Sequence, residues 1–133
     1  MVTISRRRRY TVPAEQMWKR IGDFYALHTW VPGVADVVRV PEREARRIVL
    51  ADGGELIETL VEAGECYYRY RMDEPGPIPV RNYRSALSVA SDGDHACVVE
   101  WTSEFAPRGT TEAEAGEVIS AFQVSGLDAL TQG

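Results

Sequence analysis

The feature that most constrains the fold is an amphipathic stretch near the carboxyl end of the sequence, Glu112–Thr131. Before it, Thr111 and Glu114 have the spacing of a capping box, in which the threonine side chain accepts a hydrogen bond from a free N–H group of the first turn. On a helical wheel the apolar residues fall on one face: Ala115, Val118, Ile119, Phe122, Gly126, Ala129 and Leu130. A helix with such a face buries it against another element.

Most of the chain before this helix has the pattern of strands, so the sequence predicts an α+β fold in which one long helix lies against a curved antiparallel sheet. A helix that bridges a concave sheet leaves space for a cavity, and cavities of this kind bind small apolar molecules. The alternative is that core side chains fill the space between helix and sheet.

The composition narrows the class of protein. The 133 residues are enough for one core, and we expect a single domain over residues 1–133. The net charge of −5 argues against a nucleic-acid partner, and no apolar run is long enough for membrane insertion. The first residues lack the apolar stretch of a signal peptide, and Cys66 and Cys97 lack a CxxC spacing. These features predict a cytoplasmic protein with reduced thiols.

Turn signals divide the rest of the chain into elements. Gly53 and Gly54 follow Asp52 in a strong hairpin signal, and three prolines make the stretch from 74 to 79 a stiff loop rather than a strand. The predicted order is one strand, two short helices, six strands and the final helix: Thr3–Thr11, a helix from Pro13 to Gly22, Phe24–Thr29, Val34–Val40, Ala45–Ala51, Glu55–Glu62, Cys66–Asp73, Val80–Ala90, Ala96–Phe105 and Glu112–Thr131.

Alternation along the strands assigns side chains to the two faces of the sheet. The inner face is predicted to be mostly apolar and to carry Arg46, Glu58 and Tyr70 among aromatic residues. Its members are Arg46, Ile48 and Leu50; Leu56, Glu58 and Leu60; Tyr68, Tyr70 and Met72; and Val99, Trp101, Ser103 and Phe105. A slip of one residue at either turn would reverse one strand.

The first strand contains an unusual run of four arginines, from 6 to 9. Arg6, Arg8 and Tyr10 share a face with Ile4. One interpretation is a solvated strand face that blocks aggregation. The other is that Arg6 or Arg8 reaches the cavity and meets an anionic group of a ligand.

A series of short motifs then resembles one family over nearly the whole chain. In order they are Trp18-x-x-Ile21-Gly22-Asp23-Phe24, Trp30-x-Pro32-x-Val34, Arg46-x-x-x-Leu50-x-Asp52-Gly53, Glu58-x-Leu60, Tyr70, Pro79-Val80-x-Asn82-Tyr83, Glu100-Trp101, Phe105 and Gly126-Leu127-x-x-Leu130. They resemble the polyketide cyclase/dehydrase-like branch of the START-like (SRPBCC) superfamily, many of whose members are small bacterial proteins. The resemblance implies a helix-grip fold, with seven antiparallel strands around a long C-terminal helix and a pocket between them.

The chemistry of the inner face centres on Glu58. An isolated charge there would be costly, so we expect either a partner or a raised pKa. Arg46, on the neighbouring strand, is the candidate partner, in a structural pair or as an anchor for a ligand. In an enzyme, Glu58 or His28 would remove a proton next to a carbonyl while Arg46 and Tyr70 stabilise the enolate. His28 alone is more often a packing or hydrogen-bonding residue.

The sequence therefore predicts catalytic candidates Glu58, Tyr70, Arg46 and His28, and a hydrophobic pocket lined by Trp30, Ile48, Leu56, Tyr68, Met72, Tyr83, Val99, Trp101, Phe122 and Gly126. The expected partner is a small hydrophobic or polyketide-like molecule, with no metal and no cofactor, and the expected assembly is a monomer or homodimer. The hypotheses are a cyclase or dehydratase, a non-catalytic carrier or sensor of a lipid-like or polyketide-like ligand, and an interaction module with a closed cavity.

Overall fold

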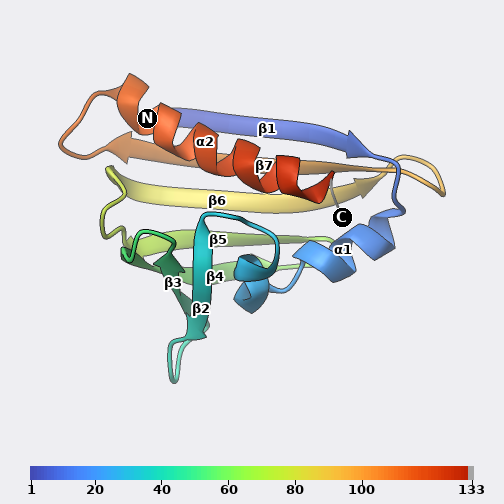
Figure 1. Cartoon of the computed structure of the whole chain (residues 1–133), viewed down its shortest axis with the longest axis horizontal. Helices are drawn as coiled ribbons and strands as arrows, with labels where there is room; N and C mark the ends of the chain where they lie inside the picture. Colours follow the sequence, from blue (N-terminus) through green and yellow to red (C-terminus); the bar gives the residue numbers. More distant parts are fainter. Residues whose placement is uncertain (132–133) are drawn as a thin grey trace.

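The computed structural model describes residues 1–131 (Figure 1). In chain order the elements are β1 (Val2–Tyr10), α1 (Ala14–Ile21), the short 3₁₀ helix η1 (Phe24–Thr29), β2 (Val34–Arg39), β3 (Ala45–Leu50), β4 (Glu55–Ala63), β5 (Tyr67–Glu74), β6 (Val80–Ser91), β7 (Cys97–Pro107) and α2 (Glu112–Leu130). Each predicted element is present, with boundaries that differ by at most two residues.

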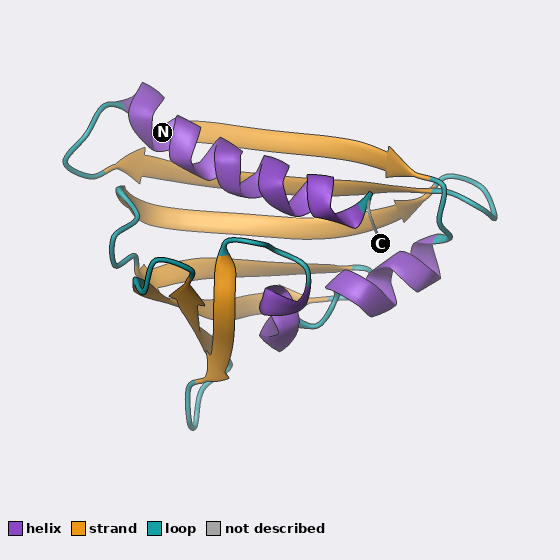
Figure 2. Cartoon of the chain, viewed as in Figure 1, coloured by secondary structure: helices purple, strands orange, loops and turns teal. Residues whose placement is uncertain are grey.

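The strands form one seven-stranded antiparallel sheet in the order β1-β7-β6-β5-β4-β3-β2. Only the pairing of β1 with β7 joins strands distant in sequence, and it brings the start of the chain beside the strand that precedes α2. Helix α2 lies along this end of the sheet, and α1 and η1 lie on the same face (Figure 2). The predicted architecture, a helix-grip fold, is confirmed.

Helix α2 begins as the capping signal predicts, because the Thr111 side chain accepts a hydrogen bond from the N–H of Glu114. Its buried face is rotated from the predicted one. Val118 is 38% exposed and Ala129 is half-buried, whereas Gln123 and Leu127 are buried. The prediction used hydrophobicity alone, and it could not include a buried glutamine that finds polar partners on the sheet.

The first strand accounts for the position of α2. The Tyr10 hydroxyl donates to the Leu127 carbonyl oxygen at 2.6 Å, Arg8 pairs with Asp128, and Arg6 donates to Ser120 Oγ. Arg6 and Arg8 share a face with Tyr10, as the alternation predicts. This face lies toward the helix, and the two arginines bind α2 to β1 and do not line the cavity.

Helix α1 and η1 form the corner between β1 and β2. Gly22 ends α1, and the Asp23 side chain accepts a hydrogen bond from Tyr25 N at the start of η1. Phe24 and Trp30 are buried, and Trp18 is partly buried against the core. No helix in the described part of the chain is both long enough and apolar enough to cross a membrane.

Candidate functional site

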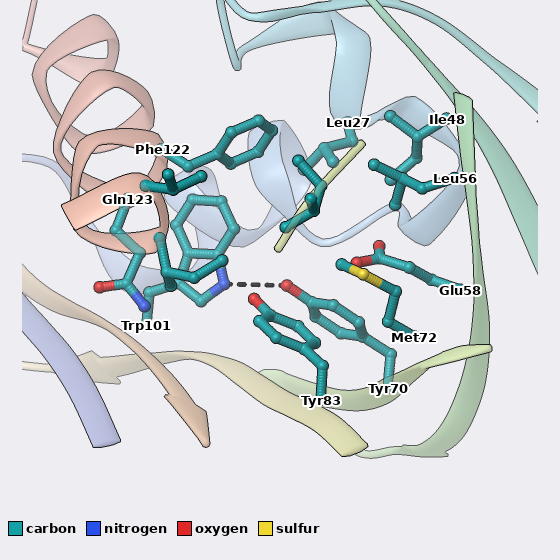
Figure 3. Close-up of a pocket in the computed structure, with 13 residues that line it drawn as sticks. Leu27, Ile48, Leu56, Glu58, Tyr70, Met72, Tyr83, Trp101, Phe122 and Gln123 are labelled. Carbon is teal, nitrogen blue, oxygen red and sulfur yellow. Dashed lines mark hydrogen bonds between the residues drawn. The ribbon is translucent and has the colours of Figure 1, made fainter. Parts of the chain in front are cut away.

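A small apolar cavity lies between the inner face of the sheet, η1 and α2 (Figure 3). Its volume is about 30 Å³, which is room for about two water molecules and far below the several hundred Å³ of a typical ligand pocket. The wall consists of Leu27, Ile48, Leu56, Glu58, Tyr70, Met72, Ile78, Tyr83, Trp101, Val118, Ile119, Phe122 and Gln123. The predicted hollow is present, but side chains fill most of it.

Strand register brings the polar wall residues together. Glu58 of β4 lies opposite Arg46 of β3 on one side and Met72 of β5 on the other. Tyr70 lies opposite Leu60, and Ser85 of β6 lies between Tyr70 and Ser103. Since alternate residues of a strand point to the same face, these side chains all reach the interior.

Arg46 and Glu58 form a buried ion pair behind the cavity. Arg46 donates from Nε and Nη2 to Glu58 Oε1 at 2.9 and 2.7 Å, and from Nη1 to the Phe24 carbonyl oxygen at 2.6 Å. Its guanidinium lies 4.0 Å from the ring centre of Phe24 and 4.8 Å from that of Tyr70. The arginine thus joins β3, β4 and η1, which is the structural role weighed in the sequence analysis.

The environment of this pair shifts both pKa values. Burial raises the pKa of Glu58, and the opposing effect of Arg46 does not fully offset it. Burial lowers the pKa of Arg46, but Glu58 and the neighbouring tyrosines raise it by more than burial lowers it. The net pKa is raised, so the guanidinium stays charged. Among the described residues, the hydrogen bonds of Glu58 use Oε1 alone. Within the described residues, Oε2 is therefore the carboxylate oxygen of Glu58 that makes no hydrogen bond.

Two tyrosines supply further polar groups of the wall. Tyr70 Oη accepts a hydrogen bond from Trp101 Nε1 at 3.0 Å (Figure 3), and Tyr83 Oη lies 2.9 Å from Ser103 Oγ. Burial raises the pKa of Tyr83 to about 12 and that of Tyr70 well above its ordinary value. Both phenols therefore keep their protons at neutral pH.

Four partly exposed side chains border the cavity toward solvent: Met72 of β5, Ile78 of the proline-rich loop, and Val118 and Phe122 of α2. The loop is held in place by Arg108, which donates to the carbonyl oxygens of Gly76 and Ile78 at 2.7 and 2.8 Å. Side-chain rotation at this border can enlarge the cavity without moving the strands, since Met72 and Phe122 pack at its margin.

The structure gathers some of the predicted site residues and separates others. On the cavity wall lie Glu58, Tyr70, Ile48, Leu56, Met72, Tyr83, Trp101 and Phe122. Arg46 touches Glu58 but does not line the wall, and Trp30, Tyr68, Val99 and Gly126 are buried in the surrounding core. His28 is exposed on η1 and does not line the cavity.

Trp30, Tyr68 and Gly126 are outside the wall because neighbouring rings cover them. Trp30 packs on Trp101 with ring centres 5.4 Å apart, and both tryptophans lie directly over Gly126. Tyr68 packs on Phe24 and Trp18. Alternation predicts which face of the sheet a side chain lies on. It does not predict whether that side chain lines the cavity or is covered by its neighbours.

Leu27, Ile78 and Gln123 are wall residues that the sequence analysis did not single out. Ile78 had a usable signal, because it is the one apolar side chain between the prolines of a loop predicted to lie at the end of the sheet. Gln123 had none. Its Oε1 and Trp30 Nε1 are buried polar atoms without a partner in the described chain.

Within residues 1–131, no group of three or more His, Cys, Asp or Glu side chains could share a metal ion.

A curved antiparallel sheet, a C-terminal helix across it and an enclosed apolar cavity define the class of helix-grip, START-like proteins. A family model described as polyketide cyclase / dehydrase and lipid transport matches residues 1–132, and the chain belongs to this family. The resemblance stated from the sequence motifs is thereby confirmed.

Solved structures agree with this assignment. The protein XoxI from Bacillus cereus is 29% identical, with a TM-score of 0.94 over 99% of this chain and 94% of that one. A protein from Thermobifida fusca is 34% identical, with a TM-score of 0.83 over 98% and 91% of the two chains. The Zhui aromatase/cyclase from a Streptomyces species shares the fold, at 16% identity and a TM-score of 0.79 over 98% and 92%. No curated protein matches the sequence.

Proposed function

We propose that the protein binds a small hydrophobic molecule in the cavity between the sheet and α2. The observation that carries this proposal is the composition of the wall, where an apolar surface surrounds a few converging polar groups, Glu58, Tyr70 and Tyr83. Apolar walls with a small number of placed polar groups are the usual form of a small-molecule site. The family description, which names cyclases, dehydrases and lipid transport, supports the same kind of ligand.

Binding requires the cavity to widen, because about 30 Å³ does not hold an aromatic ring. The side chains that rotate to make room are partly exposed and lie at the border of the cavity: Met72, Ile78, Val118 and Phe122. The strands behind them are held by the Arg46–Glu58 pair and need not move.

The test is thermal unfolding in the presence of 4-hydroxyacetophenone. A ligand that binds only the folded state raises the free energy of unfolding, by about 2.7 kcal/mol at a hundred times Kd, and the midpoint temperature rises with it. Leu56→Phe fills the cavity and should remove this rise, whereas Val61→Phe, on the exposed side of the same strand, should keep it. An unchanged midpoint for the wild type would instead favour the closed interaction module.

As an enzyme, the protein would catalyse proton transfer of the cyclase or dehydratase type. Glu58 Oε2 would take a proton from the carbon next to a ligand carbonyl, and the Tyr70 hydroxyl would donate a hydrogen bond to the oxygen that becomes the enolate. The raised pKa of Glu58 makes it a stronger base than an ordinary carboxylate. Arg46 would act through Glu58, and His28 has no part in this scheme.

The alternative is a non-catalytic carrier. It is favoured by the ion pair, because Arg46 donates two hydrogen bonds to Glu58 Oε1 and joins β3 to β4, which is a structural role that needs no reaction. The two functions separate by hydrogen–deuterium exchange at the methyl group of 4-hydroxyacetophenone in deuterium oxide, followed by NMR. An enzyme accelerates this exchange, and Glu58→Gln or Tyr70→Phe abolishes the acceleration. A carrier binds the probe without accelerating exchange.

A further inference from the structure

The hydroxyl groups behind the cavity wall have fixed directions. Ser85 Oγ donates to the Thr102 carbonyl oxygen at 2.9 Å, which uses its single proton. Ser103 Oγ lies 3.0 Å from Ser85 Oγ. Because Ser85 has no proton left for this contact, Ser103 is the donor. The proton of Ser103 is then used as well.

Tyr83 must therefore donate to Ser103. Their oxygens are 2.9 Å apart, and only Tyr83 still has a proton for the bond. The second lone pair of Ser103 accepts from Gln123 Nε2 at 3.0 Å, and the other N–H of that amide goes to the Ile4 carbonyl oxygen at 3.2 Å. The Ile4 carbonyl oxygen also fixes the orientation of the Gln123 amide, since this oxygen accepts only and must face Nε2. The Tyr83 oxygen thus remains on the cavity wall as an acceptor only.

Tyr70 has the opposite polarity. Its oxygen accepts a hydrogen bond from Trp101 Nε1, which is a donor only, so Tyr70 keeps its own proton for donation, either to the adjacent Tyr83 oxygen or to a ligand oxygen that enters between the two phenols. The rings of Tyr70 and Tyr83 lie 6.3 Å apart between centres. A molecule between them meets one donor, Tyr70, and two acceptors, Tyr83 Oη and Glu58 Oε2.

We propose that the cavity selects a neutral, mainly apolar molecule that carries a hydroxyl group, and that Ser103 is the positioning residue that makes Tyr83 an acceptor. This inference rests on the proposed function and narrows its ligand class. A ligand hydroxyl accepts from Tyr70 through its oxygen and donates its proton to Tyr83 or Glu58. A ketone only accepts, so it leaves the acceptors unmatched, and a carboxylate brings negative charge next to Glu58.

The experiment compares three probes of eight carbon atoms by isothermal titration calorimetry: 4-ethylphenol, acetophenone and 4-methylbenzoate. A buried acceptor without a donor weakens binding by about tenfold. We expect 4-ethylphenol to bind at least about tenfold more tightly than acetophenone, and 4-methylbenzoate to bind most weakly. Equal affinities, or tightest binding of 4-methylbenzoate, would overturn the inference and leave the proposed function in place. No binding of any probe would contradict the proposed function itself.

Variants then test the role of Ser103. Ser103→Ala removes the acceptor of the Tyr83 proton, so that proton becomes available to the ligand and the preference for 4-ethylphenol over acetophenone should fall to within about threefold. The matched control is Ser88→Ala, also on this sheet but on the outward face of β6, which should keep the preference.

Tyr83→Phe removes one of the two acceptors and should also lower the preference to within about threefold, which supplies a second readout if Ser103→Ala folds poorly. A preference that persists in both variants would refute the assignment of Ser103 and Tyr83. Circular dichroism on each variant establishes that a lost preference comes from a folded protein.

Discussion

Removing either member of the buried ion pair should destabilise the fold, but with different pH dependence. The Arg46 side chain has no exposed surface and that of Glu58 is 5% exposed. Breaking such a pair leaves an uncompensated buried charge and costs about 3–5 kcal/mol. In Glu58→Leu the remaining guanidinium cannot lose its proton, so the cost should be constant between pH 5 and 8. In Arg46→Met the remaining carboxyl can become neutral by binding a proton.

The sign follows from linkage. Without Arg46, burial alone acts on Glu58 and holds its folded-state pKa above the unfolded value. A raised carboxyl pKa means that stability is fully present below the unfolded pKa and is lost as pH rises through the folded pKa. The cost of Arg46→Met, relative to wild type at each pH, should therefore decrease on acidification by up to about 1.4 kcal/mol per pH unit.

Urea unfolding followed by tryptophan fluorescence measures both variants at pH 5, 6, 7 and 8. Arg47→Met is the matched control. Arg47 is the neighbour of Arg46 on β3, and its ion pair with Glu55 is exposed to solvent. This substitution should change stability by less than about 1 kcal/mol. A loss for Arg46→Met that is the same at all four pH values would refute the reasoning. So would a loss for Glu58→Leu no larger than that of the control.

Two further predictions concern the core. Burial raises the pKa of Tyr83 to about 12, so the folded protein keeps this proton when the unfolded chain has lost it, and stability should fall as pH rises from 10 to 12, by up to about 3 kcal/mol from this residue. Absorbance at 295 nm should show its phenolate forming only with unfolding, and ionisation near pH 10 in the folded protein would contradict this. Gly116→Ala should raise the thermal midpoint, because the new methyl group has ordinary contacts and alanine gains about 1 kcal/mol in a helix. Gly126→Ala should not raise the midpoint, because its methyl group would lie 3.0 Å from Trp101 and 3.1 Å from Trp30. A gain equal to that at Gly116 would show that the two tryptophans can move aside without cost.

The elements of this fold could be predicted from sequence because each carries its own signal. Thr111 caps α2 through a side chain three residues from its partner, and Gly53 adopts the positive φ of 93° that its hairpin turn requires. Strand alternation then placed Arg46, Glu58 and Tyr70 on one face. These are local effects, and they depend on the backbone of a few consecutive residues.

The candidate site was only partly predictable, because it depends on packing in depth. Alternation could not distinguish a side chain on the cavity wall, such as Tyr83, from one covered by its neighbours, such as Tyr68. Gln123 and Ser103 are polar residues 20 positions apart, and nothing in either local pattern indicates that they share a hydrogen bond. The single-domain organisation and the assembly state remain predictions.

The sequence by itself determined the order of elements, the inward faces of β3, β4, β5 and β7 and the presence of a helix that must cover the sheet, because hydrophobic periodicity and turn chemistry act over short distances. Only the tertiary structure decided that His28 lies outside the cavity and that the cavity measures about 30 Å³. It also decided that Arg46 makes hydrogen bonds that join β3 to β4 and η1. Those properties arise where side chains from η1, five strands and α2 pack into the same space, and no single segment of the chain determines that packing.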